Sequence, residues 1–160
     1  MKITFDVPDD IALGLKAVVE ETIAELTKWP QRGDEYYYIR GNSEILRTNY
    51  NDVLFDKERL EFGNMFKTKE EAEFKREQLK VMHELEELAD DNQPWGNFTA
   101  YNHYYLFYDS SNSKVKIDAS YMAHLTPFYF NTFESAKAAI SKIGEERLKK
   151  YYFCIPEDKT

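Results

Sequence analysis

The sequence has few of the residues that build covalently linked or metal-centred sites. Among its 160 residues there is one cysteine, Cys154, and there are three histidines. A single cysteine excludes an internal disulfide and favours a reducing compartment. No apolar run approaches the roughly 20 residues of a membrane-spanning helix, and acidic residues interrupt the start, MKITFDVPDD, where a signal peptide would be apolar. We therefore expect a soluble, cytoplasmic protein.

Recognisable catalytic and metal-binding motifs are also missing. His83 and Glu87 are four residues apart on a predicted helix, but the second histidine of a zinc-protease motif is absent. A structural zinc site usually has four well-spaced ligands, often cysteines, and Cys154 has no histidine near it in the sequence. There is no glycine-rich phosphate loop. The expectation is a protein without enzymatic activity, metal or cofactor.

Positive charge is in short supply. The chain has 21 Lys and Arg against 29 Asp and Glu, a formal net charge of −8. Sequence-independent nucleic-acid binding draws most of its energy from cationic contacts to phosphates, so this balance argues against nucleic acid as the partner. It favours a protein partner, or a basic surface that normally receives nucleic acid.

Aromatic residues, in contrast, are abundant, with 12 Tyr and 11 Phe. Rings pack well on the half-buried face of a sheet, so this content indicates strands beside the helices. Residues 2–7 alternate polar and apolar and predict a strand with an unpaired edge, which suggests a homodimer through this N-terminal arm. An amphipathic helix should follow to about Lys28, with an apolar stripe formed by Ile11, Leu15, Val18, Val19, Ile23 and Leu26.

The next segment contains a predicted hairpin and a long helix. The hairpin turns at Gly41-Asn42, a dipeptide suited to the positive dihedral angles of a tight turn. A less regular stretch follows. Thr68 and Glu71 then form a capping box, which predicts a helix from residue 69 to about Ala89.

The second half of the chain has the same order of elements. A hairpin over residues 103–121 precedes the extended run TPFYF. Thr132 should cap a helix over residues 133–143, Gly144 should end it, and a last helix should cover the EERLKKYY stretch.

The two segments also share residue types at fixed spacing. Matches at a constant offset of 64 positions pair Phe66, Thr68, Glu70, Ala72 and Leu79 with Phe130, Thr132, Glu134, Ala136 and Ile143, and Tyr36 matches Tyr104 at an offset of 68. We predict an α+β protein built from two repeated β-β-β-α units, preceded by an N-terminal strand and helix. The expected divisions are an arm over residues 1–30, a first unit over 31–93 and a second unit over 94–160, in one compact domain or two packed lobes.

Three phrases, WPQRGDEYYYI, GNMFKTKEEAEF and RLKKYYF, together resemble a group of small proteins encoded by phages and prophages of low-GC Gram-positive bacteria. The resemblance covers roughly residues 29–153 and leaves the N-terminal arm outside. The family carries no activity that could be assigned to individual residues. What the resemblance implies is a phage origin, and so a role in the dealings of a phage with its host.

Two surfaces are candidate binding sites. The stretch ELEELADD has five acids and no base at the end of a helix, where the macrodipole disfavours negative charge. Its acids either form a solvated face or occupy a basic, nucleic-acid-binding groove of a host protein; they are Glu84, Glu86, Glu87, Asp90 and Asp91. The alternative surface consists of strand tyrosines that are either buried, bound to protein or stacked on bases, namely Tyr36, Tyr38, Tyr104 and Tyr108.

The leading hypothesis is a non-enzymatic phage accessory protein that binds and inhibits a host macromolecule through the acidic surface. A defence component such as a CRISPR-type nuclease is the most natural target, which would make the protein an anti-defence inhibitor of the anti-CRISPR kind. One alternative is a nucleic-acid or nucleotide-binding module that uses the tyrosine-rich sheet faces. The other is a virion or assembly component.

Overall fold

The computed structural model describes residues 16–20, 28–89, 103–120 and 127–156. Most of the predicted N-terminal strand and helix lies outside these residues, and within it residues 16–20 form a helical turn. The described part of the chain combines helices with two-stranded antiparallel sheets. This combination confirms the α+β class.

The first hairpin consists of β1 (Glu35–Ile39) and β2 (Ile45–Asn49). Its turn differs from the prediction. Ser43 N donates to Arg40 O at 2.8 Å, and Ser43, rather than Gly41 or Asn42, has a positive φ, of 66°. The hairpin therefore closes with a longer loop that ends in a left-handed residue, a common alternative to the two-residue turn.

A helix that the sequence pattern did not predict, α2 (Leu54–Glu61), follows β2. Its buried residue is Asp56, which is 3% exposed, whereas Leu54 and Phe55 are 68% and 67% exposed. The inward position is a carboxylate and large apolar residues face solvent, so α2 lacks the apolar stripe by which amphipathic helices are found in a sequence.

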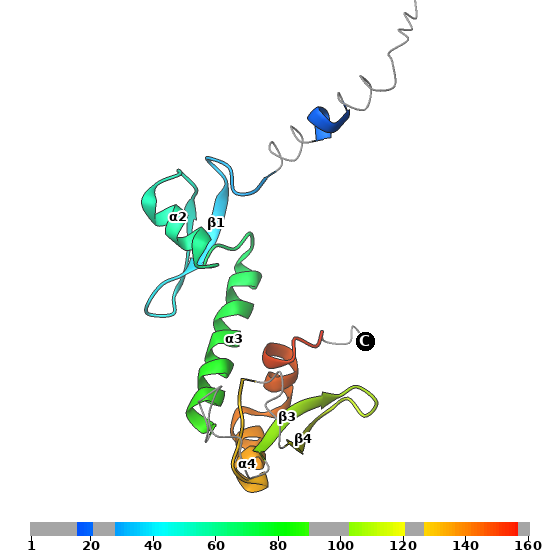
Figure 1. Ribbon diagram of the computed structural model, residues 1–160. Helices are drawn as coiled ribbons and strands as arrows, with labels where there is room; N and C mark the ends of the chain where they lie inside the picture. The colour runs from blue at the N-terminus through cyan, green and yellow to red at the C-terminus, as the bar shows by residue number, and fades with distance from the viewer. Residues whose placement is uncertain (1–15, 21–27, 90–102, 121–126, 157–160) are drawn as a thin grey trace, which may run out of the picture.

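The long helix α3 (Lys69–Leu88) begins at the predicted capping box, with Glu71 N 3.1 Å from Thr68 Oγ1 and Thr68 N 3.3 Å from Glu71 Oε2. Its 20 residues give a length of about 30 Å. Figure 1 shows α3 running between two lobes. The N-terminal lobe contains β1, β2 and α2, and the C-terminal lobe contains the described elements that follow α3.

The C-terminal lobe contains a second hairpin and three helical segments. The hairpin consists of β3 (His103–Asp109) and β4 (Lys114–Ser120). The helical segments are α4 (Phe133–Ile143), the short turn α5 (Glu145–Arg147) and a π-helical turn, η1 (Leu148–Tyr152). As predicted, Thr132 caps α4, with Ser135 N 3.0 Å from its Oγ1, and Gly144 follows it with a φ of 93°.

Opposite faces of α3 are buried along its length. Val81 and Leu85 are fully buried in an apolar core with residues of the C-terminal lobe, which are Leu106, Val115, Phe128, Phe130, Ala136, Ala139, Ile143 and Leu148. Ala72 is also fully buried, yet it is nine residues before Val81, a separation of two and a half helical turns. The helix contacts β1 and β2 as well as α4 and η1. One side of α3 therefore packs on the N-terminal lobe and the opposite side packs on the C-terminal lobe.

Each lobe also contains an isolated antiparallel bridge. Tyr37 pairs with Phe66 in the first, and Tyr104 pairs with Phe130 in the second. By these bridges the counterpart of Tyr104 is Tyr37, so the match of Tyr104 with Tyr36 at an offset of 68 was wrong by one residue. The third strand that we predicted in each unit is thus reduced to a single bridge. In addition, α2 interrupts the predicted order of the first unit.

Candidate functional site

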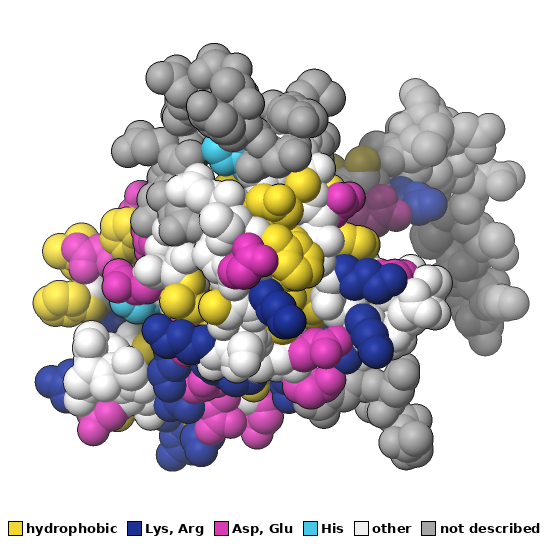
Figure 2. All heavy atoms as spheres, turned by 90° about the horizontal axis from the view of Figure 1, so that it is seen from below, with side chains coloured by type: hydrophobic (Ala, Val, Ile, Leu, Met, Phe, Trp, Pro, Cys, Tyr) yellow, Lys and Arg dark blue, Asp and Glu magenta, His cyan; other side chains and the backbone are white. Residues whose placement is uncertain are grey.

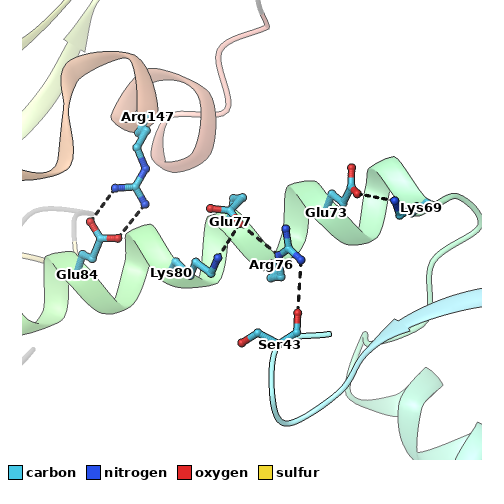
Figure 3. Close-up of polar contacts among 8 residues, drawn as sticks. All are labelled: Ser43, Lys69, Glu73, Arg76, Glu77, Lys80, Glu84 and Arg147. Atoms are coloured by element: carbon cyan, nitrogen blue, oxygen red, sulfur yellow. Dashed lines mark hydrogen bonds and ion pairs between the residues drawn. The ribbon is translucent and has the colours of Figure 1, made fainter. Parts of the chain in front are cut away.

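The acidic stretch at the end of α3 is only partly available to a partner. Both terminal nitrogens of Arg147 donate to the carboxylate of Glu84, at 2.8 and 2.9 Å (Figure 3). This paired hydrogen bond lowers the pKa of Glu84 below its ordinary value, against the raising effect of burial. Glu84 therefore joins α3 to α5 within the protein; its side chain is 35% exposed, and its role in binding a partner stays a prediction.

The other predicted acids have different surroundings. Glu86 and Glu87 are exposed, and Glu86 Oε2 lies 3.8 Å from His83 Nδ1. Asp90 and Asp91 lie outside the described residues. On the face of the molecule seen in Figure 2, acidic and basic side chains are interspersed rather than gathered by sign. Of the acids of this stretch that the structure describes, Glu86 and Glu87 are open to solvent and Glu84 is paired with Arg147.

Tyr36, the first residue of the predicted aromatic surface, is fully buried in a polar network. Its hydroxyl donates to Asp56 Oδ1 at 2.6 Å and accepts from Arg59 Nη1 at 2.6 Å. Asn51 N donates to the other oxygen of Asp56 at 2.7 Å. Burial by itself raises the pKa of Asp56, but hydrogen bonds from Tyr36, Asn51 and Val53 outweigh it and lower the pKa below its ordinary value. The network fastens α2 to β1.

The remaining tyrosines of that surface belong to two separate sheets. The guanidinium carbon of Arg59 lies 3.6 Å from the centroid of the Tyr38 ring. Tyr104 meets Phe133 edge to face at 6.2 Å, and Tyr108 lies 6.2 Å from Phe153. These rings are half-buried within their own lobes. Of the alternatives predicted for these tyrosines, burial holds for Tyr36, which is 0% exposed and so cannot stack on a base.

A groove beside α3, which sequence reasoning missed, has a more suitable composition. It is formed where the side of α3 that carries Val81 and Leu85 continues beyond η1. Glu70, Phe74 and Glu77 lie on this side, since residues four and seven apart share a helix face. Phe74 is 37% exposed, and its ring centroid is 5.3 Å from that of Tyr151 in η1.

Two adjoining hollows make up this α3 groove. One, of about 590 Å³, is lined by Glu70, Glu73, Phe74, Arg76, Glu77, Lys150 and Tyr151. The other, of about 490 Å³, is lined by Phe66, Glu70, Glu71, Phe74 and Lys75. They share Glu70 and Phe74, so the groove is continuous across these two residues. It combines aromatic rings with carboxylates over the first half of α3.

Charge pairs along α3 flank the groove and hold the lobes (Figure 3). Glu77 Oε1 accepts from Lys80 Nζ at 2.8 Å and lies 3.2 Å from Arg76 Nε, and Arg76 also donates to Ser43 O at 3.4 Å. The hydrogen bond from Lys80 is the main cause that lowers the pKa of Glu77. Arg76 thus ties α3 to the β1–β2 turn, as Arg147 ties it to α5.

Large apolar side chains are exposed on the N-terminal lobe next to the groove. Phe62, at the end of α2, is 81% exposed. It lines a further hollow of about 270 Å³ with Ile39, Gly63, Asn64, Phe66, Lys75 and Leu79. Because Phe66 and Lys75 belong to both hollows, the apolar surface of this lobe runs into the α3 groove.

The side chains considered for nucleophilic and metal chemistry can be placed within the described part of the chain. Cys154 is exposed, and Gln78 Nε2 lies 3.4 Å from its sulfur. Residues 16–20, 28–89, 103–120 and 127–156 contain no group of three or more His, Cys, Asp and Glu side chains arranged to hold a metal ion. Within the same ranges, no helix has both the length and the apolar character that crossing a membrane requires.

Comparisons of the chain with protein-family models, with curated protein sequences and with solved structures give no match. The resemblance to phage-encoded proteins therefore stays a prediction from the three phrases quoted above.

One signal for the groove was present in the sequence. Phe74 falls on the apolar stripe of α3 with Val81 and Leu85, and it stands between Glu70 and Glu77 at helical spacing. An apolar residue bracketed by acids on a core-facing stripe indicates that the stripe leaves the core at that point. What the sequence could not supply is Tyr151, which η1 brings to the same place.

Proposed function

We propose that this protein is a non-enzymatic accessory protein of phage origin that binds and inhibits a host protein through the α3 groove. The observation that carries the proposal is the uncovered side of α3 at Phe74, beside Tyr151. Exposed apolar surface rimmed by polar residues often marks a protein-binding site. Aromatic residues are enriched in such interfaces. The apolar surface around Phe62 extends the same face.

Inhibition follows from occupying a site that the host protein needs. Carboxylates beside aromatic rings offer a partner both negative charge and a stacking surface. Nucleic acid presents the same two features, phosphates and bases, to the protein channels that hold it. A CRISPR-type nuclease holds its nucleic acid in a positively charged channel. The net charge of −8 steers the protein toward such a surface. The site of action on this proposal is the cytoplasm of the host cell.

Nucleic-acid binding through the tyrosine faces is not proposed. Tyr36 is fully buried and Arg59 covers one side of Tyr38. The role in a virion or its assembly stays a prediction of the sequence.

The proposal extends to the architecture, in which the two lobes are repeats of one β-β-β-α unit. Support comes from the capping Thr68 and Thr132 and from the two bridges, each of which pairs a tyrosine of the first strand with the phenylalanine two residues before the cap. Slow hydrogen exchange at the Tyr37 and Tyr104 amides, which donate to Phe66 O and Phe130 O at 2.9 and 2.8 Å, is the expected result. Protection at only one of the two would contradict equivalent units.

Self-association through the N-terminal arm is part of the same proposal. Val18 and Val19, in the described helical turn, are 60% and 53% exposed. Light scattering should give a dimer for the full chain and a monomer for a chain that starts at Lys28. A monomeric full chain at micromolar concentration would contradict this prediction.

The proposed function is tested by capture from host lysate with tagged wild-type protein, Phe74→Ala and Phe133→Ala, scored by mass spectrometry with and without nuclease treatment. Phe133 is a matched control because it is 45% exposed, lies outside the groove at the start of α4 and, like Phe74, contacts one tyrosine. We expect one host protein that resists nuclease, is lost with Phe74→Ala and is retained with Phe133→Ala. Equal capture by both variants, or a protein released by nuclease, would overturn the proposal.

A further inference from the structure

We infer that the α3 groove takes an arginine or lysine side chain of the partner protein, with its charged head at Glu70 and its stem on Phe74 and Tyr151. This inference rests on the proposed function, because it names the chemistry of the partner that the groove binds. It also moves the contact from the predicted stretch at Glu84–Asp91 to the other end of the helix.

The carboxylates of the groove differ in whether a cation of the protein already pairs with them. Glu73 lies 3.2 Å from Lys69 Nζ, and Glu77 is held by Lys80 and Arg76 (Figure 3). Among the described residues, no cation lies within 4.0 Å of Glu70, although it lines both hollows. Glu71, which lines one hollow, uses its carboxylate to accept from the backbone nitrogens of Lys67 and Thr68. Glu70 is therefore the acid of the groove with capacity for an incoming cation.

The rings supply the second half of the recognition. The planes of Phe74 and Tyr151 are inclined at 48°, with their centroids 5.3 Å apart. Lys150 Nζ already lies 5.5 Å from the centroid of Tyr151, so a cation is tolerated at this wall of the groove. Attraction of a cation to an exposed ring corresponds to about a two- to fivefold change in Kd. The methylene stem of Lys or Arg packs on apolar surface while its head stays with water and carboxylates.

Other occupants fit the groove less well. An acidic segment is repelled by Glu70 and by the net charge of −8, while the cations that line the same hollow, Arg76 and Lys150, already contact Glu77 and the Tyr151 ring. A purely apolar segment would remove the Glu70 carboxylate from water without giving it a counter-charge, which is strongly unfavourable. Only a side chain with an apolar stem and a cationic head satisfies both the rings and the acid.

The test uses the full-length protein and a fluorescein-labelled peptide of alternating arginine and glycine, at physiological ionic strength. Binding is measured by fluorescence anisotropy and mapped by the amide shifts of the ¹⁵N-labelled protein. The groove variant is Glu70→Gln with Phe74→Ala. The matched control is Glu134→Gln with Phe133→Ala, which makes the same two changes at exposed residues of α4.

We expect the peptide to shift the amides of Glu70, Phe74 and Tyr151. The groove variant should raise Kd about three- to thirtyfold, the range that the loss of one ring contact and one charge contact represents. The control should change Kd less than twofold. Equal weakening by both variants would show non-specific attraction to an acidic protein and overturn the inference, as would shifts confined to residues outside the groove.

Failure here is distinguishable from failure of the proposed function. If the groove variant loses the host protein in the capture experiment while the arginine peptide does not bind the groove, the proposed function stands and the inferred partner chemistry is wrong. If the groove variant captures the host protein as wild type does, both are overturned.

Discussion

Replacing Tyr36 by phenylalanine should destabilise the N-terminal lobe much more than its small size change implies. The substitution keeps the ring and removes a hydroxyl that donates to Asp56 and accepts from Arg59, each at 2.6 Å. The side chain of Asp56 is 4% exposed and cannot regain water, whereas that of Arg59 is 26% exposed and can. A hydrogen bond to a charged group contributes about 1.5–3 kcal/mol. We count the Asp56 bond in full and the Arg59 bond only in part, and expect a loss of about 2–3 kcal/mol.

Tyr50→Phe is the matched control, because the Tyr50 hydroxyl also donates to a carboxylate, Asp52 Oδ1, at 3.1 Å, but in an exposed position. Its cost should stay below about 0.5–1 kcal/mol. The measurements are urea unfolding followed by circular dichroism and hydrogen exchange of the Tyr37 amide, which reports on β1 itself. Equal losses for the two variants would refute the view that the buried network, rather than ring packing, fastens α2 to β1.

The same network has a defined pH dependence. The pKa of Asp56 is lower in the folded protein than in the unfolded chain, where it is about 3.9. A lowered carboxyl pKa adds stability that is fully present above the unfolded value and is lost as the pH falls through the folded value. The Tyr36 bond is one cause of the lowering. The difference between wild type and Tyr36→Phe should therefore be constant near neutral pH and narrow below about pH 4. A gap that is unchanged down to pH 2, with the lobe still folded, would contradict this linkage.

Three further predictions concern packing, backbone and the ion pair. Leu85→Ala should lower the free energy of unfolding by about 2–5 kcal/mol because Leu85 is fully buried. Leu79 is 51% exposed, so Leu79→Ala should change the free energy of unfolding by less than about 0.5 kcal/mol. Similar urea midpoints for the two variants would contradict the placement of Leu85 in the core. Gly144→Ala should cost about 1–2 kcal/mol because the φ of 93° is strained for a residue with a Cβ, and thermal unfolding that matches wild type would count against it. Glu84→Gln should cost at most about 1 kcal/mol, since its side chain and that of Arg147 are 35% and 37% exposed, and should leave capture of the host protein intact; loss of capture would return Glu84 to the partner surface.

Much of the local structure could be predicted from the sequence because its causes are local. The start of α3 at residue 69 depends on Thr68 and Glu71, and the limits of α4 depend on Thr132 and Gly144. Their hydrogen bonds join residues three or four apart, so the spacing of the residue types contains the information. The two hairpins were found for the same reason, although the turn at Ser43 was not, because several loop lengths fit a Gly-Asn sequence.

The tertiary structure decided which of these elements present a surface. It buried Tyr36 under Arg59 and Asp56, which are 20 or more residues away, and so removed it from the predicted stacking face. It also paired Glu84 with Arg147, 63 residues further along the chain.

The sequence by itself determined the α+β composition, the caps and the apolar stripe of α3, since each depends on residue types within a few positions of one another. Only the tertiary structure decided that η1 brings Tyr151 against this stripe at Phe74 and leaves Phe74 37% exposed. The physical reason is that the sequence of an amphipathic helix specifies which side of the helix is buried. How much of that side is covered depends on how far the packing partners, here η1 and the N-terminal lobe, extend along the helix.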